Sequence, residues 1–398
     1  RRYFGRKFKS CLKVASKEVI TSTNWRVHPN NQWSFQNIEK LFATEVIKKS
    51  EKKPSVFSSN LSKIDAIEFV TLEEKKQTVK EMLKNGYADS FLVLKKGEII
   101  FEEYFNGMSQ ESLHLLNSIS KNFTGMLTGV IVKLGLINVD EKVINYLPKL
   151  KDTAFNETTV RQVLDMTAAV KYDENYDNPT TDFWQETSAV GWSPNLLNKN
   201  SSDLFNYALS LKDKEQKDGS SFHYRTVLTN ILGMVLEAAT GKKVPLLLEE
   251  LIWKKLLPEQ DALIVVDNEG VSYTGAGMNA CTRDLARFGL MLSKEGYFEG
   301  QEVIPPEWIK DTVNAEKTYK DNFSKDILGQ ILPGGHYRNQ TLVDKNGSLF
   351  CLGIFGQCIY VNPKYETVIV KLSSQPGPAI PNLLIDSMIA MNKIAVSV

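Results

Sequence analysis

The most informative stretch of the chain is Ser118-Ile-Ser-Lys121-Asn-Phe-Thr-Gly-Met-Leu-Thr-Gly-Val-Ile-Val-Lys133. Its apolar residues recur at steps of three and four, which is the pattern of a helix with one buried face. These positions are Ile119, Phe123, Met126, Leu127, Val130, Ile131 and Leu134. Residues three apart share one face of a helix, so the Lys121 amine can reach the Ser118 hydroxyl. The sequence predicts a buried helix that begins with a serine beside a lysine.

A serine followed by lysine three residues later is a weak signal alone. The pairs in this chain are Ser10/Lys13, Ser50/Lys53 and Ser118/Lys121. Only the last opens an amphipathic helix, where free N–H groups of the first turn can stabilise an oxyanion. A serine becomes a good nucleophile when a base takes its proton, and lysine is such a base when burial or a neighbouring cation keeps it neutral. The alternative is a capping serine beside a surface lysine.

Two further segments carry candidate chemistry. Tyr224 precedes an apolar helical pattern at 227–239 that ends at Gly241, and such a tyrosine can relay a proton. Its alternative role is packing. The second segment, 353–358, contains glycines in a run that we interpret as a strand, where glycine often marks close approach of a ligand to the backbone. The alternative there is a β-bulge.

Composition excludes several classes of protein. The 398 residues include 48 Lys+Arg and 47 Asp+Glu, for a net charge of +1, and 42% are hydrophobic. This balance is typical of a folded domain and argues against disorder and general nucleic-acid binding. No apolar run is long enough to span a membrane. The four cysteines and four histidines do not have metal-ligand spacing, so no metal site is predicted. His336 is a candidate to line a substrate cleft, and the alternative is an ordinary surface position.

The order of elements predicts an α+β fold. Strands are expected at 91–94 and 99–105, near the start, and at 350–361 and 367–372, near the end. Helical patterns lie between them, and a last helix is expected at about 380–394. We therefore expect a sheet built from both ends of the chain with a helical insertion.

The order of the motifs resembles a known family. Ser118-x-x-Lys121, then Tyr224-x-Thr226, then the glycine-rich run at 353–358 are similar to the serine β-lactamase/penicillin-binding superfamily, in particular its class C-like branch with nylon-oligomer (6-aminohexanoate dimer) hydrolases and family VIII esterases. The likeness covers about residues 34–396. It implies a β-lactamase-like fold, an antiparallel sheet flanked by helices. The implied division is an α/β domain of 1–116 and 245–398, with 1–33 as an N-terminal extension, and a mainly helical domain of 117–244.

The resemblance also implies roles for single residues. Ser118 would be the nucleophile, Lys121 its base and Tyr224 the second group that handles protons. The oxyanion would lie between the backbone N–H groups of Ser118 and Cys358. The implied substrate-binding residues are Tyr176, Thr226, Phe355, Gly356 and Gln357.

Two departures from the penicillin-recognising pattern bear on the substrate. Those enzymes have Lys-Thr-Gly on the late strand, whereas this chain has Phe355-Gly356-Gln357, without a cation, and it has Thr226 where they have Asn. Loss of a charge-assisted contact to a carboxylate removes roughly 1.5–3 kcal/mol of binding. We therefore expect no efficient β-lactam hydrolysis and a more apolar acyl group near Phe355.

The sequence thus predicts a serine hydrolase that cleaves a small-molecule ester or amide through an acyl-enzyme on Ser118, without a cofactor. The alternatives are a β-lactamase or D,D-peptidase and a non-catalytic binding member of the fold. No nucleic acid and no membrane span are expected. Cytoplasmic or periplasmic location, and whether the chain forms a homodimer, stay open.

Overall fold

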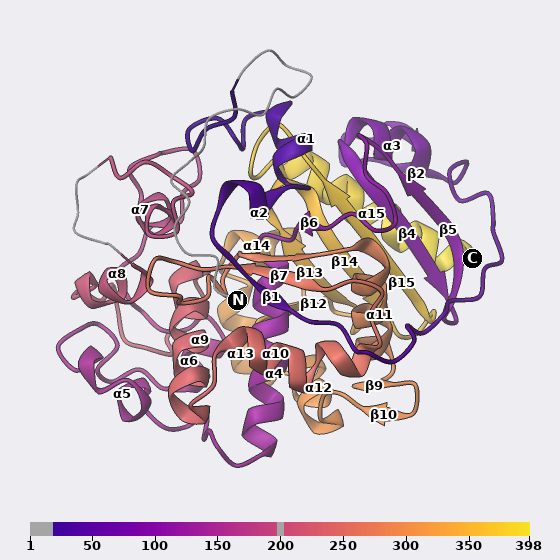
Figure 1. The fold of residues 1–398 in the computed structure, drawn as a ribbon. Helices are drawn as coiled ribbons and strands as arrows, with labels where there is room; N and C mark the ends of the chain where they lie inside the picture. The colour runs from indigo at the N-terminus through magenta and orange to yellow at the C-terminus, as the bar shows by residue number, and fades with distance from the viewer. Residues whose placement is uncertain (1–18, 197–202) are drawn as a thin grey trace.

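A seven-stranded antiparallel sheet forms one side of the protein (Figure 1). The computed structural model describes residues 19–196 and 203–398, so Ser10, Lys13 and the basic residues around them lie outside the described residues. In spatial order the strands are β11 (His336–Arg338), β12 (Thr341–Val343), β13 (Leu349–Gly353), β14 (Gln357–Asn362), β15 (Thr367–Ser373), β4 (Ala88–Lys95) and β5 (Glu98–Tyr104). Strand β15 pairs with β4, so the two ends of the chain build one sheet, as predicted.

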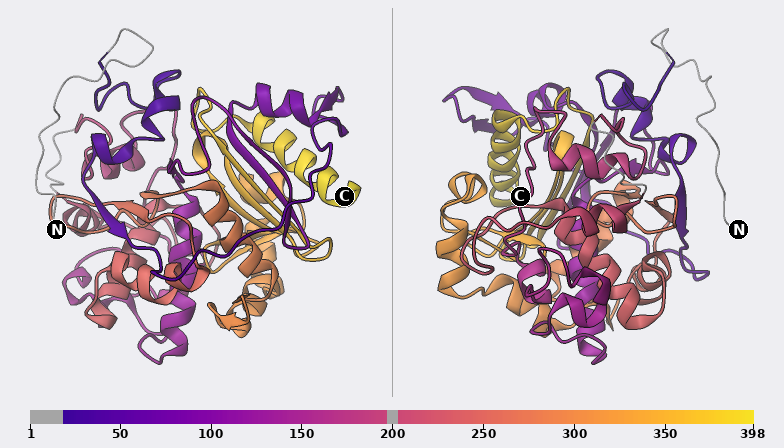
Figure 2. Two further views of the ribbon diagram at one scale, coloured as in Figure 1. Left: turned by 45° about the vertical axis from the view of Figure 1, so that its right-hand side comes forward. Right: turned by 90° about the vertical axis from the view of Figure 1, so that its left-hand side faces the viewer.

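Helices cover both faces of this sheet. On one face α15 (Pro381–Ser397) packs with α3 (Val79–Asn85), and Met391 of α15 lies 3.6 Å from the sulfur of Cys358. On the other face α11 (Thr282–Ser293) contacts β4, β14 and β15. The two turned views show α15 along the outer side of the sheet (Figure 2). The strands β4, β14 and β15 are buried on both faces and therefore read as apolar runs.

A second, four-stranded sheet leads the chain to the candidate serine. Its strands, in spatial order, are β1 (Thr44–Ile47), β7 (Ala262–Val265), β8 (Met278–Ala280) and β6 (His114–Leu115). Two small hairpins are formed by β2 (Glu68–Val70) with β3 (Lys76–Thr78), and by β9 (Tyr297–Phe298) with β10 (Gln301–Glu302). Strand β6 ends at Leu115, and α4 (Ile119–Lys133) begins four residues later. Pairing of β6 with β8 therefore fixes where α4 starts.

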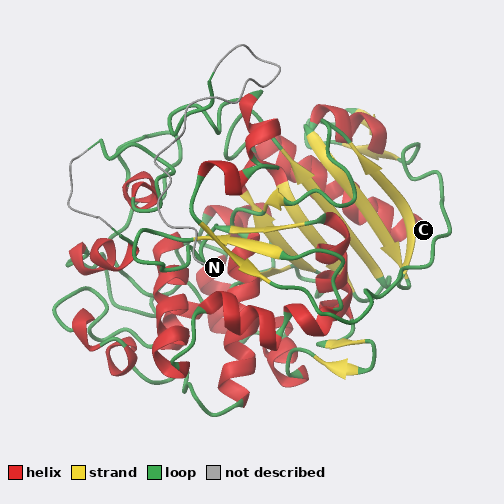
Figure 3. Cartoon of the chain, in the orientation of Figure 1, coloured by secondary structure: helices red, strands yellow, loops and turns green. Residues whose placement is uncertain are grey.

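Many of the other helices lie together beside the large sheet, in the lower left of the view in Figure 3. Around α4 lie α5 (Val143–Tyr146), α6 (Val160–Leu164), α7 (Asp182–Ser188), α8 (Leu204–Ser210), α9 (Thr226–Thr240) and α10 (Val244–Leu251). The remaining helices are α1 (Asn30–Ser34), α2 (Ile38–Leu41), α12 (Pro306–Val313), α13 (Lys317–Phe323) and α14 (Ile327–Ile331). The sequence predicted that only one face of α4 is buried, whereas every residue from Ile119 to Ile131 is buried in the structure. The helix runs between the sheet, α9 and α10 and has no wet face over most of its length.

Several predicted boundaries agree with the structure. Gly135 and Gly241 follow α4 and α9 in the left-handed conformation, with φ of 72° and 69°, the usual way for a helix to end. Thr159 caps α6 in a capping box with Gln162. No helix within residues 19–196 and 203–398 is long and apolar enough to cross a membrane. The division into domains of 1–116 with 245–398 and of 117–244 stays a prediction.

One predicted strand is wrong. The run 350–361 is not one strand but two, β13 and β14, joined by a turn at Ile354–Gly356. Phe355 has φ of 64° and Gly356 has φ of 91°, and two successive residues in the left-handed region reverse the chain. Phenylalanine disfavours this conformation, so the apolar pattern concealed the turn.

Candidate active site

Ser118 and Lys121 lie side by side at the start of α4, as predicted. The Nζ atom of Lys121 is 2.9 Å from the Oγ atom of Ser118. Ser118 is the N-cap residue, and its side chain makes no capping bond to the helix. Among the described residues its backbone N–H has no acceptor, since the bonds of this turn begin at Ile119. Both the hydroxyl and this N–H are therefore available to a reacting group.

The lysine is buried and fully coordinated. Lys121 is 1% exposed, and its Nζ atom lies 3.0 Å from Thr226 Oγ1 and 2.8 Å from the Gly275 carbonyl oxygen, in addition to Ser118. A lysine ammonium has three protons, so these three contacts account for all of them. Burial lowers the pKa of Lys121 to about 8, although the carboxyls of Glu174 and Glu186 act in the opposite direction. A neutral amine is thus accessible near neutral pH.

Tyr224 lies against both groups. The centroid of its ring is 4.9 Å from the Lys121 ammonium, and its hydroxyl is hydrogen-bonded to Ser118. Burial, together with the nearby Glu174 carboxyl, raises the pKa of Tyr224 well above its usual value. The phenol therefore stays protonated and can act as a proton donor beside the serine. Ser118, Lys121, Tyr224 and Thr226 are thus brought together.

A carboxylate from the long loop joins this group. The Oε1 atom of Glu174 accepts from Thr226 Oγ1 at 2.6 Å and from the Tyr176 hydroxyl at 2.8 Å, and Oε2 accepts from the Thr226 N–H at 2.5 Å. The N–H of Thr226 opens α9, and a helix N-terminus favours a negative charge. Burial raises the pKa of Glu174, while Lys121 and the bonds from Thr226 act against that shift. Thr226, predicted to contact substrate, is instead fully buried between Lys121 and Glu174.

A second buried chain of polar groups supports the Gly275 carbonyl. The Gly275 N–H donates to Asn230 Oδ1 at 2.9 Å, and the Asn230 amide donates to Glu186 at 2.6 Å. Glu186 also accepts from the Tyr172 hydroxyl at 2.5 Å. Burial raises the pKa of Glu186 to about 8. Only glycine fits at position 275, because a Cβ atom there would lie 2.6 Å from the Thr226 methyl carbon.

The turn between β13 and β14 approaches the backbone just before the serine. Asn117, in the left-handed conformation with φ of 49°, donates from its side chain to the Ile354 carbonyl at 3.1 Å. At Gly353 a Cβ atom would lie 2.4 Å from the Leu116 carbonyl oxygen. Gly353 thus allows the end of β13 to lie directly against residues 116–117, in agreement with the expected close backbone approach.

The backbone N–H of Cys358 does not face this site. The pair Gly353–Gln357 closes the turn Ile354–Gly356. Along an antiparallel strand, successive residues direct their N–H groups alternately to the neighbouring strand on one side and to the one on the other side. Cys358 therefore points its N–H to Lys371 on β15, its partner on that side. Its predicted role as an oxyanion donor conflicts with this register. By the same alternation, the N–H of Leu352 points away from β14, toward the side of β13 on which β12 lies. Strand β12 pairs only with Leu349 and Phe350, so the edge of β13 at Leu352 is free.

The predicted substrate residues of this turn are mostly occupied by the sheet. The Gln357 amide donates to the Ser373 carbonyl at 2.7 Å and accepts from the Ser373 N–H at 3.0 Å, so it extends the ladder as a backbone partner would. The Gly356 carbonyl accepts from buried Lys371 at 3.2 Å. Phe355 is 3% exposed, and its ring packs edge to face on Phe35 at 5.2 Å between centroids. Contact of these residues with substrate stays a prediction.

Two other candidates differ in their surroundings. Tyr176 is half-buried, donates to Glu174 and packs edge to face on Phe183 at 4.9 Å between centroids. Its role in substrate binding stays a prediction. His336 is not a surface residue, because it is only 2% exposed. Its Nε2 atom donates to the Thr312 carbonyl at 2.8 Å. Ser50 and Lys53 lie in a loop, with Lys53 exposed, as expected for a pair without function.

Sequence reasoning missed Glu174, Gly275, Asn230 and Lys371 as parts of this region. None lies in a motif, and each reaches the site through contacts between distant segments. The sequence offered an indirect signal only for Glu174, which lies in the long polar loop around Tyr176.

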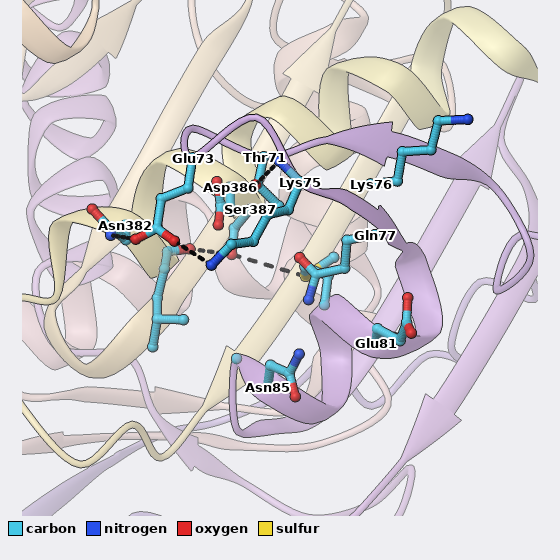
Figure 4. A pocket seen from close by; sticks show the side chains of 13 residues that line it. Thr71, Glu73, Lys75, Lys76, Gln77, Glu81, Asn85, Asn382, Asp386 and Ser387 are labelled. Atoms are coloured by element: carbon cyan, nitrogen blue, oxygen red, sulfur yellow. Dashed lines mark hydrogen bonds and ion pairs between the residues drawn. The ribbon is translucent and has the colours of Figure 1, made fainter.

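A surface hollow of about 390 Å³ lies elsewhere, between α3, β3 and α15 (Figure 4). Two of its charged lining residues, Glu73 and Lys75, form an ion pair at 2.8 Å, and Ser118, Lys121 and Tyr224 do not line it. In the described parts of the chain, no cluster of three or more His, Cys, Asp or Glu side chains could hold a metal ion.

The family model "Beta-lactamase" matches residues 76–384. The chain belongs to this family. The predicted β-lactamase-like fold and the resemblance to the serine β-lactamase/penicillin-binding superfamily, whose members are hydrolases, are therefore confirmed.

Individual relatives narrow the likeness. The 6-aminohexanoate-dimer hydrolase of Paenarthrobacter ureafaciens is 28% identical over 362 residues, which are 90% of this chain and 89% of the relative. A solved structure from Bacillus anthracis, of a protein proposed to be a 6-aminohexanoate-dimer hydrolase, is 26% identical with a TM-score of 0.86, covering 95% of this chain and 97% of its own. A family VIII carboxylesterase has a TM-score of 0.56 at 16% identity over 78% of this chain and 94% of its own. That last likeness concerns the fold alone.

Proposed function

We propose that this protein is a serine hydrolase that cleaves an ester or amide through an acyl-enzyme on Ser118. The observation that carries the proposal is the arrangement of hydrogen bonds around Lys121. The Gly275 carbonyl can only accept, and Thr226 gives its one proton to Glu174, so both oxygens accept from Lys121. A neutral lysine has two protons, and both are used there. Its lone pair then faces the Ser118 hydroxyl, 2.9 Å away.

The first step follows from this arrangement. The Ser118 hydroxyl gives its proton to the lone pair of Lys121, and the Oγ atom forms a bond to the carbonyl carbon of the substrate. The carbonyl oxygen becomes an oxyanion. Lys121 is now an ammonium, and its three protons point to the oxygens of Ser118, Thr226 and Gly275 that already surround it. No side chain therefore has to reorient.

The oxyanion needs donors that are already in place. We infer that these are the N–H of Ser118, at the start of α4, and a backbone N–H at the end of β13, where Asn117 is bonded to the Ile354 carbonyl. Both are backbone groups held by regular structure, so they need no reorganisation when charge develops. The bond from Asn117 to Ile354 holds the two segments together. This assignment replaces Cys358.

Tyr224 is suited to the second half of the reaction. As the bond to the leaving group breaks, the alcohol or amine leaving group must gain a proton. The Tyr224 phenol can donate it and regain a proton from the Lys121 ammonium. Water then attacks the carbonyl carbon of the acyl-enzyme and gives one proton to Lys121 or Tyr224. These groups pass the proton to Ser118 Oγ as the acid is released.

The names of the relatives support an ester or amide as the substrate. One is a 6-aminohexanoate-dimer hydrolase, and a second, of known structure, is proposed to be one. A β-lactamase or D,D-peptidase is the second candidate, and the lack of a cation at Phe355-Gly356-Gln357 argues against it. A non-catalytic binding role is the third, and the complete set of Ser118, Lys121 and Tyr224 argues against it.

Burst kinetics with p-nitrophenyl acyl esters test the proposal. We expect hydrolysis by the wild type and its loss in Ser118→Ala, together with loss of labelling by a fluorophosphonate probe. Ser50→Ala, in the serine–lysine pair of the loop at 50–53, is the matched control and should behave as the wild type. Undiminished hydrolysis by Ser118→Ala would refute the mechanism, and labelling by a fluorescent penicillin with rapid turnover would favour the β-lactamase reading.

A further inference from the structure

A carboxylate is connected to the candidate base through one hydroxyl group. Lys121 Nζ lies 3.0 Å from Thr226 Oγ1, and Thr226 Oγ1 lies 2.6 Å from Glu174 Oε1. Thr226 is fully buried, so no water competes for its hydroxyl. Because a hydroxyl has one proton, Thr226 must donate to the carboxylate and accept from the lysine. The three groups form one directed chain.

The direction of this chain matters for the reaction. Each step that gives Lys121 a proton creates a buried positive charge, which is costly unless a negative charge or a polarised acceptor stabilises it. Glu174 polarises the Thr226 hydroxyl and makes its oxygen a better acceptor for that charge. The carboxylate is itself held by three bonds, from the Thr226 N–H, the Thr226 hydroxyl and the Tyr176 hydroxyl.

We propose that Glu174 is a positioning residue that orients Lys121 through Thr226 and stabilises its protonated form during acylation, as the carboxylate of a Ser-His-Asp triad does for histidine. The proposal rests on the hydrolase function proposed above. The proton balance is complete: the Ser118 proton moves to Lys121, Thr226 keeps its one proton, Glu174 stays ionised, and the ammonium passes its proton through Tyr224 to the leaving group.

The proposal gives a reason for the threonine at position 226, which the resemblance implied to be a substrate-binding residue. Residue 226 needs a side chain that accepts from Lys121 and donates to Glu174 with a single small group, and a buried threonine hydroxyl does both. Further titratable or charged side chains act on Lys121 or Glu174: Tyr172, Tyr176, Glu186, Tyr224, Arg225, Tyr273 and Tyr337. Of these seven, Tyr176 alone is bonded to Glu174 directly.

The test is the pH profile of kcat/KM for p-nitrophenyl ester hydrolysis by Glu174→Gln. Removing the negative charge makes the Lys121 ammonium less stable, so the acid limb should move to lower pH by about one unit. The plateau should fall about tenfold or more, because the ammonium that forms during acylation loses its stabilisation. Asp177→Asn, an exposed carboxylate of the same loop, is the matched control and should change neither the limb nor the plateau.

A second variant covers the case in which Glu174→Gln fails to fold. Thr226→Val removes the hydroxyl at equal size and should move the limb in the same direction, whereas Thr226→Ser keeps the hydroxyl and should restore the wild-type limb. A lower plateau with an unmoved limb in Glu174→Gln would mean a purely structural anchor and would overturn the proposal. A wild type without Ser118-dependent hydrolysis would instead refute the hydrolase function, and this proposal with it.

Discussion

The carbonyl oxygen of Gly275 lies 2.8 Å from the Nζ atom of Lys121. Among the described residues, it is the one acceptor around the lysine that belongs to the backbone. A side chain at this acceptor could rotate away, but a carbonyl fixed by the bond from its own N–H to Asn230 cannot. The position of the lysine is therefore set by the fold as much as by its own helix.

Gly275→Ala should damage the site without removing a reactive group. The new Cβ atom would lie 2.6 Å from the Thr226 methyl carbon and 3.2 Å from Asn230 Oδ1, so the loop has to shift. We expect kcat to fall about tenfold or more with a smaller change in KM, and a loss of about 1–3 kcal/mol in the free energy of unfolding. Steady-state kinetics and urea denaturation measure both. Gly377→Ala, whose Cβ would meet only Ile380 at 3.4 Å, serves as the control.

Hydrolysis should increase with pH through the pKa of Lys121. Burial lowers this pKa to about 8, and the neutral amine is the active base. Below pH 8 the ammonium predominates, so kcat/KM should fall about tenfold for each pH unit well below that value. A profile measured from pH 5 to 9.5 checks this. An acid limb near pH 4–5, as for a carboxylate, would contradict the assignment of the base.

The two buried lysines should each add stability that increases with pH between about 8 and 9.5. Lys121 and Lys371 are both buried with pKa values lowered to about 8, whereas an unfolded lysine titrates near 10.4. In this window each lysine is more fully protonated in the unfolded chain, so raising the pH favours the folded state by up to about 1.4 kcal/mol per pH unit for each lysine. The thiols of Cys281, Cys351 and Cys358, whose pKa values are raised by burial, act in the opposite direction. Urea denaturation of the wild type and of Lys371→Met tests the claim. The variant should show a clearly smaller slope.

Gln357→Ala should weaken the end of the large sheet. Its amide satisfies both the N–H and the carbonyl of Ser373 where β14 turns away from β15. Leaving these groups unpaired in a buried place should cost about 2 kcal/mol or more of the free energy of unfolding. Lys364→Ala, in an exposed turn of the neighbouring hairpin, should change it by less than about 0.5 kcal/mol. Equal stability of the two variants would show that the amide bonds are not needed.

The helical part of the site could be predicted because its information is local. The start of α4 is marked by a change of period, and Ser118 and Lys121 are neighbours on one helix face. The end of α9 at Gly241 and the cap at Thr159 are likewise properties of adjacent residues. These features need no knowledge of how distant segments meet.

The rest of the site depends on such meetings. Glu174 and Gly275 have no periodic pattern around them, and each gains its role only when its loop packs against Thr226. The role of Cys358 was implied by the resemblance, and it conflicts with the register because Phe355 turns the chain before this residue. A turn that holds a phenylalanine in the left-handed region is stabilised by the bonds of Asn117, Gln357 and Lys371, which come from three separate segments.

The shortness of β12 has a consequence for how such a protein could be switched off. This strand is only three residues long, and it leaves the neighbouring edge of β13 uncovered where the Leu352 N–H points outward. Because we propose that the end of β13 supplies an oxyanion donor, one extra rung on that ladder would be expected to cover this edge and stop the reaction, with every reactive side chain intact. Inactive descendants of such a protein could therefore arise through strand extension alone, and an alignment of the serine, lysine and tyrosine would not reveal them.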